Sequence, residues 1–354
     1  MKLVNIVIPS ICSVLLVACS HKPKTDIDTV CQRDDIGNYI IKWETTPEID
    51  GTMELFVSNE PSFSKNSTSV SVTPINEGIA TYVTNDNITR KYFCLVFNKK
   101  NKIIISSRNL PMDSIQNLRD MGGYITSDKK HTTKWGKVFR SGELSQLSNP
   151  DSLRLDNLQI KTIIDLRSKG ESTASPDAYS KAKIIRIAIP DNDTYQLDER
   201  LREGKIKMRD GLLYLQDTYL QYIDNYSDYF AQALQVFVDK KNYPILFHCT
   251  LGKDKSGFLA AMLLSAAGVD RDKIRADYMD SNNYIDVSRM ASLAIGLNND
   301  AQEAMTIILS ANDELFDIVF DKITKEYGSV DKYLEKVMKL SHKDRERIRE
   351  NLLE

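Results

Sequence analysis

The sequence predicts two folded domains, a small all-β sandwich followed by a larger α/β domain. At 354 residues the chain is long enough to bury two hydrophobic cores. Its first third holds short runs of β-branched and aromatic residues separated by turn residues, a pattern typical of an all-β module. The remainder alternates apolar, strand-like runs with amphipathic stretches of ten or more residues, which favours a central sheet flanked by helices.

The overall composition excludes one class of partner. Apolar residues make up 42% of the chain and charged residues 27%, which is ordinary for globular domains. The formal net charge of -2 gives no electrostatic reason to bind a polyanion. We therefore expect no nucleic-acid partner.

The first 18 residues differ from the rest and predict a leader. Lys2 is their only charged residue, and the apolar run that follows is shorter than the roughly 20 residues of a membrane span. Leu16-Val17-Ala18-Cys19 resembles the lipobox of bacterial lipoproteins, in which the cysteine is acylated after cleavage. That resemblance implies a signal peptide at 1–18, lipid on Cys19, a polar tether at 19–29, and an exported chain anchored to a membrane on its periplasmic side or at the cell surface. An ordinary signal peptide or an uncleaved anchor are the alternatives.

Residues 30–107 carry the pattern of the sandwich. The predicted strands are Tyr39–Trp43, Met53–Val57, Thr68–Val72, Tyr92–Phe97 and Ile103–Ile105, with turn residues between them. Their spacing resembles fibronectin type III and immunoglobulin-like modules. That resemblance leaves a Cys31–Cys94 disulfide open. We see no chemistry in this domain, which favours a spacer or docking module.

Residues 109–354 carry the pattern of the α/β domain. The predicted strands are 160–166, 183–189 and 245–248, and the predicted helices are 212–237, 256–267, 314–327 and 330–352. In such a fold, functional groups gather at the carboxyl ends of the strands.

One short segment carries the chemistry. A buried strand ends at Cys249, a polar loop turns at Gly252, and a helix begins near Ser256. Loop N–H groups and the helix N-terminus then converge beside the thiol, which suits a tetrahedral dianion and favours the thiolate. The spacing of glycine and lysine does not match the loop of nucleotide-binding proteins.

The residues His248-Cys249-x-x-Gly252-Lys253-Asp254-x-Ser256-Gly257 resemble the signature loop of bacterial tyrosine phosphatases that carry Gly-Lys-Asp in this loop and often also accept phosphoinositides. Three upstream segments resemble further motifs of that family in the same order, namely Asn117–Gly123, Arg140–Gly142 and Asp165–Arg167. The resemblance implies a cysteine-phosphatase-like sheet and hydrolysis of phosphate monoesters through a cysteinyl phosphate on Cys249, without metal or cofactor.

The same resemblance implies roles for the other loop residues. His248 supports the loop, and Ser256 offers a hydroxyl to the departing thiolate. Lys253 supplies a positive charge beside the phosphate, and the remaining substrate-binding positions are Thr250, Leu251 and Gly252.

The leaving oxygen needs a proton, and two aspartates compete to supply it. Asp254 is the favoured acid in the family that the loop resembles, and Asp191 follows a strand as the acid does in other tyrosine phosphatases. Arg119 either lines the pocket or pairs with Asp120 beneath it. A further set, Asp165, Arg167 and Glu171, is expected to form an ion-pair brace.

Lys255 departs from the family pattern, which has arginine at this position. A guanidinium holds two phosphoryl oxygens with parallel bonds, whereas an ammonium cannot reproduce that geometry. Two functions of different class therefore stay open: an exported hydrolase that acts on phosphorylated protein or phosphoinositide-like substrates, and a surface lipoprotein that binds phosphate esters with impaired turnover.

Overall fold

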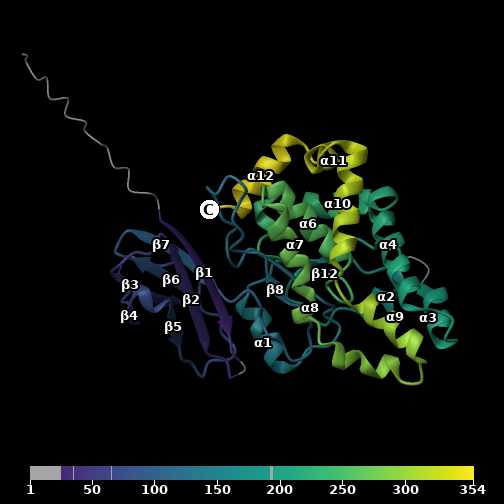
Figure 1. Cartoon of the computed structure of the whole chain (residues 1–354), viewed down its shortest axis with the longest axis horizontal. Helices are drawn as coiled ribbons and strands as arrows, with labels where there is room; N and C mark the ends of the chain where they lie inside the picture. Colours follow the sequence, from purple (N-terminus) through teal and green to yellow (C-terminus); the bar gives the residue numbers. More distant parts are fainter. Residues whose placement is uncertain (1–24, 35, 65, 192–193) are drawn as a thin grey trace, which may run out of the picture.

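The computed structural model describes residues 25–34, 36–64, 66–191 and 194–354. The leader and Cys19 lie outside these residues. A β-rich part, purple and blue in Figure 1, lies beside a larger part of strands and helices. Among the helices within the described ranges, none combines the length and apolar composition that a membrane span requires.

The first domain contains two antiparallel sheets. One has the strand order β1-β2-β5 and the other β4-β3-β6-β7. The strands are β1 (Asp26–Arg33), β2 (Tyr39–Thr46), β3 (Thr52–Ser58), β4 (Ser71–Pro74), β5 (Ile79–Tyr82), β6 (Tyr92–Phe97) and β7 (Asn101–Ser106). A short 3-10 turn at Ile75–Glu77 joins β4 to β5.

Alternation along the strands builds the core between the two sheets. Ile41 and Trp43 of β2 face Phe93 and Phe97 of β6, and all four are buried in one cluster. The Trp43 indole donates to the Ile75 carbonyl at 2.7 Å, so its one polar atom is satisfied. The predicted strands at 39–43, 53–57, 92–97 and 103–105 are therefore confirmed.

Two boundaries in this domain differ from the prediction. Strand β1 begins at Asp26, inside the tether predicted for 19–29, and β5 was not predicted. Every second residue of β1 is exposed, because successive side chains of a strand point to opposite faces of the sheet. In the sequence, these exposed polar residues resemble those of a solvated linker, which is why the first part of β1 was predicted as tether. Strand β4 lies at 71–74 instead of 68–72.

Cys31 and Cys94 are both free thiols, so the disulfide that the spacing left open is not formed. The reason is the alternation of strand faces. Cys31 belongs to the core between the sheets, as do Phe93 and Leu95, the two neighbours of Cys94. Cys94 is buried but lies outside that core, since its side chain leaves the strand on the opposite face.

The second domain is built on a five-stranded sheet in the order β11-β10-β12-β9-β8. The first four are parallel and β8 is antiparallel. The strands are β8 (Arg119–Asp120), β9 (Val138–Ser141), β10 (Thr162–Asp165), β11 (Lys183–Arg186) and β12 (Ile245–His248). His248 pairs in register with both Asp165 and Ser141. The carboxyl ends that carry the three predicted motifs therefore meet at one edge.

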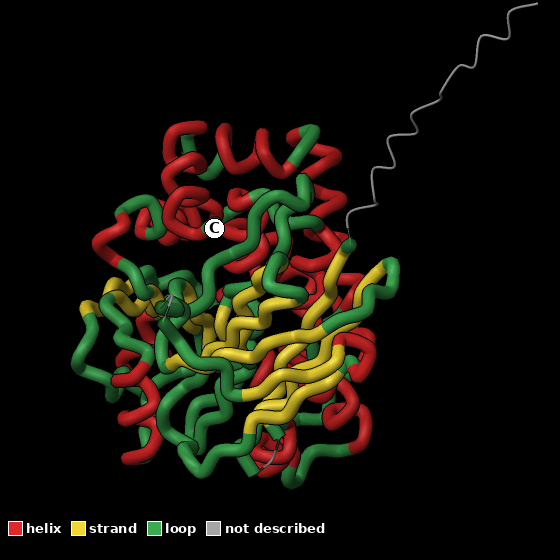
Figure 2. The backbone as a smooth tube through the Cα atoms, turned by 90° about the vertical axis from the view of Figure 1, so that its left-hand side faces the viewer, coloured by secondary structure: helices red, strands yellow, loops and turns green. Residues whose placement is uncertain are grey.

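Helices surround this sheet. Figure 2 views the molecule from the side of the sandwich, with the helices in red above and behind the strands. The helices are α1 (Asn149–Asn157), α2 (Lys169–Ala174), α3 (Thr194–Arg202), α4 (Met208–Asp224), α5 (Ser227–Val236), α6 (Lys255–Ala267), α7 (Arg271–Met279), α8 (Ser281–Tyr284), α9 (Asn299–Leu309), α10 (Asp313–Tyr327), α11 (Val330–Lys336) and α12 (His342–Leu352). Two 3-10 segments, Lys240–Asn242 and Val287–Ala294, complete the set. Nearly every residue of α6 is buried, so this helix is the centre of the domain.

Two helices predicted as continuous are broken in the structure. The stretch 212–237 divides into α4 and α5 at Asn225 and Tyr226, and 330–352 divides into α11 and α12. In the second case Lys339 adopts a left-handed conformation, and Ser341 with Asp344 forms a capping box that starts α12. The apolar periodicity continues across both breaks, which is why it indicates one helix.

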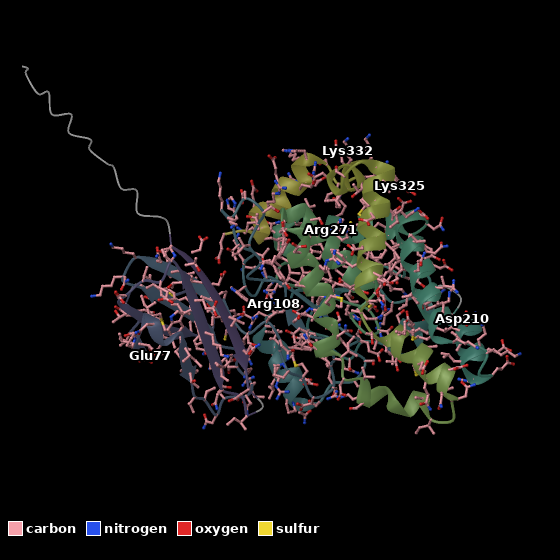
Figure 3. All side chains as sticks on the ribbon, viewed as in Figure 1. Glu77, Arg108, Asp210, Arg271, Lys325 and Lys332 are labelled. Atoms are coloured by element: carbon pink, nitrogen blue, oxygen red, sulfur yellow. The ribbon has the colours of Figure 1, made fainter. Side chains whose placement is uncertain are left out.

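The two domains share buried residues at their junction. Trp135 of the second domain is packed into the core of the sandwich, and its indole donates to the Ile104 carbonyl at 3.1 Å. Arg90, which precedes β6, forms an ion pair with Asp120 of β8 at 2.5 Å. Figure 3 labels Arg108 at this junction, where its guanidinium stacks on the Tyr124 ring at 3.8 Å from the centroid. The sandwich is therefore packed against the sheet that carries the site.

Candidate active site

The loop from Cys249 to Asp254 joins β12 to α6. Cys249 is the first residue after the strand and is 5% exposed. Gly252 turns the chain with φ +67°, and a Cβ there would lie 2.3 Å from the carbonyl oxygen of Ser141. Only glycine fits this position without displacing β9, so the tight loop predicted from the sequence is confirmed.

Neighbouring motifs hold the carbonyl oxygens of the loop. The Glu143 amide donates to the Thr250 carbonyl at 3.1 Å, and the Asn117 side-chain amide donates to the Leu251 carbonyl at 2.9 Å. The Gly252 carbonyl accepts from the Arg140 guanidinium at 2.6 Å. The upstream motifs therefore act by fixing the loop backbone from outside.

With the carbonyl groups turned outward, the loop N–H groups are left uncommitted. Within the described part of the chain, no backbone N–H from Thr250 to Asp254 donates to a protein acceptor. The N-terminus of α6 has no side-chain cap, although Lys255 and Ser256 in its first turn are buried. A buried helix end with free donors is a site for an anion, and here it lies directly after Cys249.

A buried ion network lies beneath the loop. Arg140 donates to the Gly252 and Lys253 carbonyl groups and lies 2.5 Å from Asp277 of α7. Asp277 also accepts from Arg119 at 3.0 Å and from the Tyr124 hydroxyl at 2.9 Å. Burial opposes the charged form, but the two guanidinium groups outweigh it and hold the pKa of Asp277 well below its usual range. The network therefore keeps a charged carboxylate under the loop.

This network corrects the substrate-binding role proposed for Arg119. Its side chain is fully buried, and it donates to Asp277, to Ser281 and to the Asn117 side chain. Arg119 also does not pair with Asp120, which instead accepts from Arg90. Adjacent residues of a strand point to opposite faces, so these two side chains serve different partners.

His248 belongs to a second ion network at the strand ends. Its Nε2 lies 3.2 Å from Asp177, and Arg167 lies 2.8 Å from Asp177 and 2.9 Å from Asp165. Burial opposes ionisation of Asp177, but the bond from His248 lowers its pKa. The brace predicted around Asp165 and Arg167 is thus present, with His248 attached to it.

The ligand atoms of Asp165, Asp177 and His248 lie within 4.8 Å of one another, a spacing that could suit a metal ion. Both carboxylates, however, are already bonded to Arg167. The guanidinium supplies the positive charge that a metal would otherwise bring, so we interpret this cluster as structural.

Glu171, the third residue predicted for the brace, serves the loop instead. It accepts from the Thr250 hydroxyl and lies 3.3 Å from the Lys255 ammonium. Burial raises the pKa of Glu171, but the Lys255 charge and these hydrogen bonds outweigh it, and the pKa falls to about 2. Its carboxylate is therefore charged at neutral pH beside the catalytic loop.

Lys255 has its three donors engaged by protein groups. Its Nζ lies 2.6 Å from Asp191, 3.0 Å from the Ile189 carbonyl and 3.3 Å from Glu171. Burial lowers the pKa of Lys255, but Glu171 and Asp191 outweigh that effect and raise it.

The two candidate acids have different partners. Asp191 is paired with Lys255, as described above, whereas Asp254 accepts from the Tyr219 hydroxyl at 2.5 Å and lies 3.0 Å from Lys253. Both of these contacts use Oδ1 of Asp254, and among the described residues no group bonds to its Oδ2. Asp254 therefore keeps one oxygen for a substrate.

Tyr219 is a further residue of the site, which no sequence motif indicates. It is buried, and its hydroxyl also lies 2.9 Å from the Tyr278 hydroxyl. Burial, together with the Asp254 charge, raises the pKa of Tyr219 well above its usual value. No short-range pattern marks this residue, because it lies 35 positions before Asp254.

Lys253 does not occupy the position predicted for it. The side chain is fully buried, and its Nζ donates to the Ile308 and Ser310 carbonyl groups at 2.8 and 3.0 Å. Exposed carbonyl groups at a helix C-terminus attract cations, and these two lie at the end of α9. Lys253 therefore fastens α9 to the loop. Ser256 is buried with no hydrogen-bond partner among the described residues, so its hydroxyl is free.

Comparisons with known proteins show which family the chain resembles. The model of the tyrosine phosphatase family matches residues 110–354. A protein of Cupriavidus necator assigned as a tyrosine-protein phosphatase is 31% identical over 237 residues, which is 64% of this chain and 82% of that protein. The triple specificity protein phosphatase PtpB of Mycobacterium tuberculosis is 28% identical over 254 residues, 62% of this chain and 90% of that protein.

Among solved structures, the core catalytic domain of the PP-IP phosphatase SIW14 from S. cerevisiae, in complex with citrate, is 13% identical. The match covers 57% of this chain and 91% of that chain, with a TM-score of 0.27. The family model covers more than half of the chain, and the Cupriavidus relative is matched over most of its length. The chain therefore belongs to the tyrosine phosphatase family and is a phosphoric monoester hydrolase.

Proposed function

We propose that the chain removes a phosphoryl group from a phosphorylated protein or a similar ester through a cysteinyl phosphate on Cys249. The observation that carries this proposal is the set of uncommitted N–H groups from Thr250 to Asp254, in the loop that follows Cys249. These donors and the α6 N-terminus would hold the phosphoryl oxygens while charge builds on them.

The first step transfers the phosphoryl group to sulfur. The Cys249 thiolate attacks phosphorus in line, the bond between phosphorus and the ester oxygen breaks, and that oxygen takes a proton. Asp254 is the better placed donor, because its free Oδ2 faces no protein partner among the described residues. Asp191 is instead held by the Lys255 ammonium at 2.6 Å.

The second step returns the enzyme to its starting state. Water attacks phosphorus, the bond between phosphorus and sulfur breaks, and Asp254 takes back a proton from the water. The free hydroxyl of Ser256 can donate to the departing thiolate, because no other group among the described residues uses it. His248 contributes by holding the end of β12 against Asp177.

The closing experiment traps the intermediate. The chain without its leader is mixed with an aryl phosphate, quenched in acid and analysed by mass spectrometry. We expect a gain of one phosphoryl group on the peptide that contains Cys249, and loss of both the adduct and turnover in Cys249→Ser. Turnover that persists in Cys249→Ser would refute the mechanism.

A second candidate function is retention of phosphate esters with slow turnover. One observation favours it, the engagement of all three donors of Lys255 by Asp191, Glu171 and Ile189. The group that should stabilise the transition state is then partly neutralised before substrate arrives. Tight binding of a phosphopeptide with turnover near the uncatalysed rate would favour this alternative.

We further propose that Cys19 carries lipid and anchors the exported chain to a membrane. The lipobox-like segment before Cys19 supports this proposal. Replacing Cys19 with serine should abolish incorporation of a labelled fatty acid and release the chain from the membrane fraction. Unchanged labelling would refute the anchor.

A further inference from the structure

The charges around Cys249 bear on which phosphate esters can enter, and this inference rests on the proposed function. Two ammonium groups lie in the loop, on Lys253 and Lys255. A lysine ammonium has three N–H donors and no acceptor, so the partners of these donors decide whether either cation is open to a substrate.

Each of the two ammonium groups has three partners within the protein. Lys253 contacts two carbonyl groups at the end of α9 and the Asp254 carboxylate, all within 3.0 Å. Lys255 contacts one carbonyl group and the carboxylates of Asp191 and Glu171, all within 3.3 Å. Both cations are therefore committed to the protein.

Carboxylates, in contrast, reach the surface of the site. The side chains of Asp254, Asp191 and Glu171 are 25%, 29% and 31% exposed, whereas those of Lys253 and Lys255 are 0% and 9% exposed. No other lysine or arginine among the described residues forms an ion pair with these three carboxylates. The rim of the site, defined here by Asp191 and Glu171, therefore exposes carboxylates more than the ammonium groups of Lys253 and Lys255.

The donors left for an anion are the N–H groups from Thr250 to Asp254, which have no acceptor among the described residues. They suit a single phosphoryl group. A second phosphate on a neighbouring atom of the substrate would lie near the rim, where it would meet carboxylates and committed ammonium groups. Like charges at such distances disfavour a complex, and opposite charges favour it.

We propose that the substrate is an isolated phosphomonoester in neutral or basic surroundings, in a protein a phosphorylated side chain flanked by lysine or arginine. Esters with a second phosphate beside the first, such as an inositol bisphosphate, are selected against. This narrows the substrate class that the sequence left open, in which Lys253 was expected to contact groups beside the phosphate.

The test compares three substrates on the wild-type chain. Two are phosphotyrosine peptides of one length, flanked either by lysines or by glutamates, and the third is a short-chain phosphatidylinositol bisphosphate. At low ionic strength we expect kcat/KM for the lysine-flanked peptide to be at least about tenfold higher than for either of the other two substrates. Added salt should reduce this ratio, because it screens the charges. Preference for the glutamate-flanked peptide or the bisphosphate would overturn the proposal.

A variant isolates the role of Lys253. Since its donors serve α9, Lys253→Met should change kcat/KM for the monophosphate peptide and the bisphosphate by the same factor. A larger loss for the bisphosphate would show that Lys253 binds a second phosphate. The ratio of the kcat/KM values for the two substrates does not depend on how much of the variant is folded.

Binding separates this proposal from the proposed function. In Cys249→Ser, calorimetry should show tighter binding of the lysine-flanked peptide than of the other two ligands. If the wild type hydrolyses nothing but this order of affinities holds, the hydrolase mechanism fails and the substrate class stands. If hydrolysis occurs with the reverse order, only the substrate class fails.

Discussion

Arg90 of the sandwich lies 2.5 Å from Asp120 of β8, and both side chains are buried. Asp120 also accepts from the amides of Gly122 and Gly136, each at 2.7 Å. Burial lowers the pKa of Arg90, but the Tyr92 and Asp120 charges outweigh it and raise it. One ion pair thus joins the two domains next to the strand that carries Arg119.

We predict that Arg90→Met lowers the free energy of unfolding by about 3–5 kcal/mol, because it leaves a buried carboxylate without its cation. Urea unfolding measures this change. The double variant Arg90→Met with Asp120→Asn should recover part of the loss. As a matched control, Lys181→Met removes the surface pair with Asp156 at 2.5 Å and should change stability by less than about 1 kcal/mol. Equal losses in the two single variants would contradict the structural role of Arg90.

The junction between the two domains also bears on whether the second domain is stable by itself. The catalytic motifs all lie after residue 107, which suggests from sequence that the sandwich is dispensable. In the structure, however, Trp135 is packed in the sandwich core. A chain that starts at 107 would expose this indole and leave Asp120 unpaired, so it should be poorly soluble.

The acid stability of the protein should depend on Glu171. Its pKa is about 2 in the folded chain and about 4.5 when unfolded, so the folded state favours the carboxylate. A depressed pKa gives stability that is present above pH 4.5 and is lost as the pH falls toward 2. We predict that Glu171→Gln is less stable than wild type at pH 7, by on the order of 2 kcal/mol, and that the difference shrinks between pH 5 and 2. Urea unfolding at several pH values checks this; a difference that grows on acidification would show that the carboxylate is not stabilised by folding.

What the sequence could predict depends on how close the residues lie along the chain. The loop from His248 to Gly257 is continuous, so strand, turn and helix could be predicted together. Partners from distant segments could not. Asp277 supports the loop from α7, and Tyr219 contacts Asp254 from α4, yet neither lies in a local pattern.

Lys253 and Arg119 illustrate the opposite error. The resemblance implies substrate contact for Lys253 and leaves it open for Arg119, but each is fully buried and satisfied by protein groups. Only the packing of α9 and α7 decides which way these side chains turn. Parallel strands end at the same edge of a sheet, so the predicted strands 160–166 and 245–248 already place Asp165 near His248, whereas β9 with Ser141 was not predicted.

The choice of general acid can be tested by varying the leaving group. Asp254→Asn should reduce kcat by about 10²–10³-fold on a phosphotyrosine peptide, whose phenolate leaves poorly without a proton. The loss should be much smaller on an aryl phosphate with an acidic phenol. Asp191→Asn should lack this dependence on the leaving group, because Asp191 is engaged by Lys255. If the dependence appears in Asp191→Asn instead, the roles of the two aspartates are exchanged.

Tyr219→Phe provides a matched control for this experiment. It removes the hydroxyl that donates to Asp254 Oδ1 but keeps the ring in the core. If Asp254 is the acid and this bond positions it, kcat should fall more on the phosphotyrosine peptide than on the aryl phosphate with an acidic phenol. Equal losses on the two substrates would mean that the bond does not serve proton donation.

The last prediction concerns Lys255, where the family has arginine. The ammonium uses its three donors on Asp191, Glu171 and Ile189, so a phosphoryl group finds none free. A guanidinium carries five donors, enough to keep both carboxylates and to place parallel bonds on two phosphoryl oxygens. Lys255→Arg should therefore raise turnover by about 10-fold or more, equivalent to about 1.4 kcal/mol of transition-state stabilisation.

Turnover of wild type, Lys255→Arg and Lys255→Ala on one phosphopeptide decides the matter. The order arginine, lysine, alanine is expected if the loop works as in the rest of the family but below its capacity. Lys255→Ala should be the slowest, because it removes the cation that pairs with both Glu171 and Asp191 and leaves two carboxylates beside an incoming dianion. If lysine is the fastest of the three, the site is built around the ammonium and its two carboxylates, and the arrangement seen here is the working one.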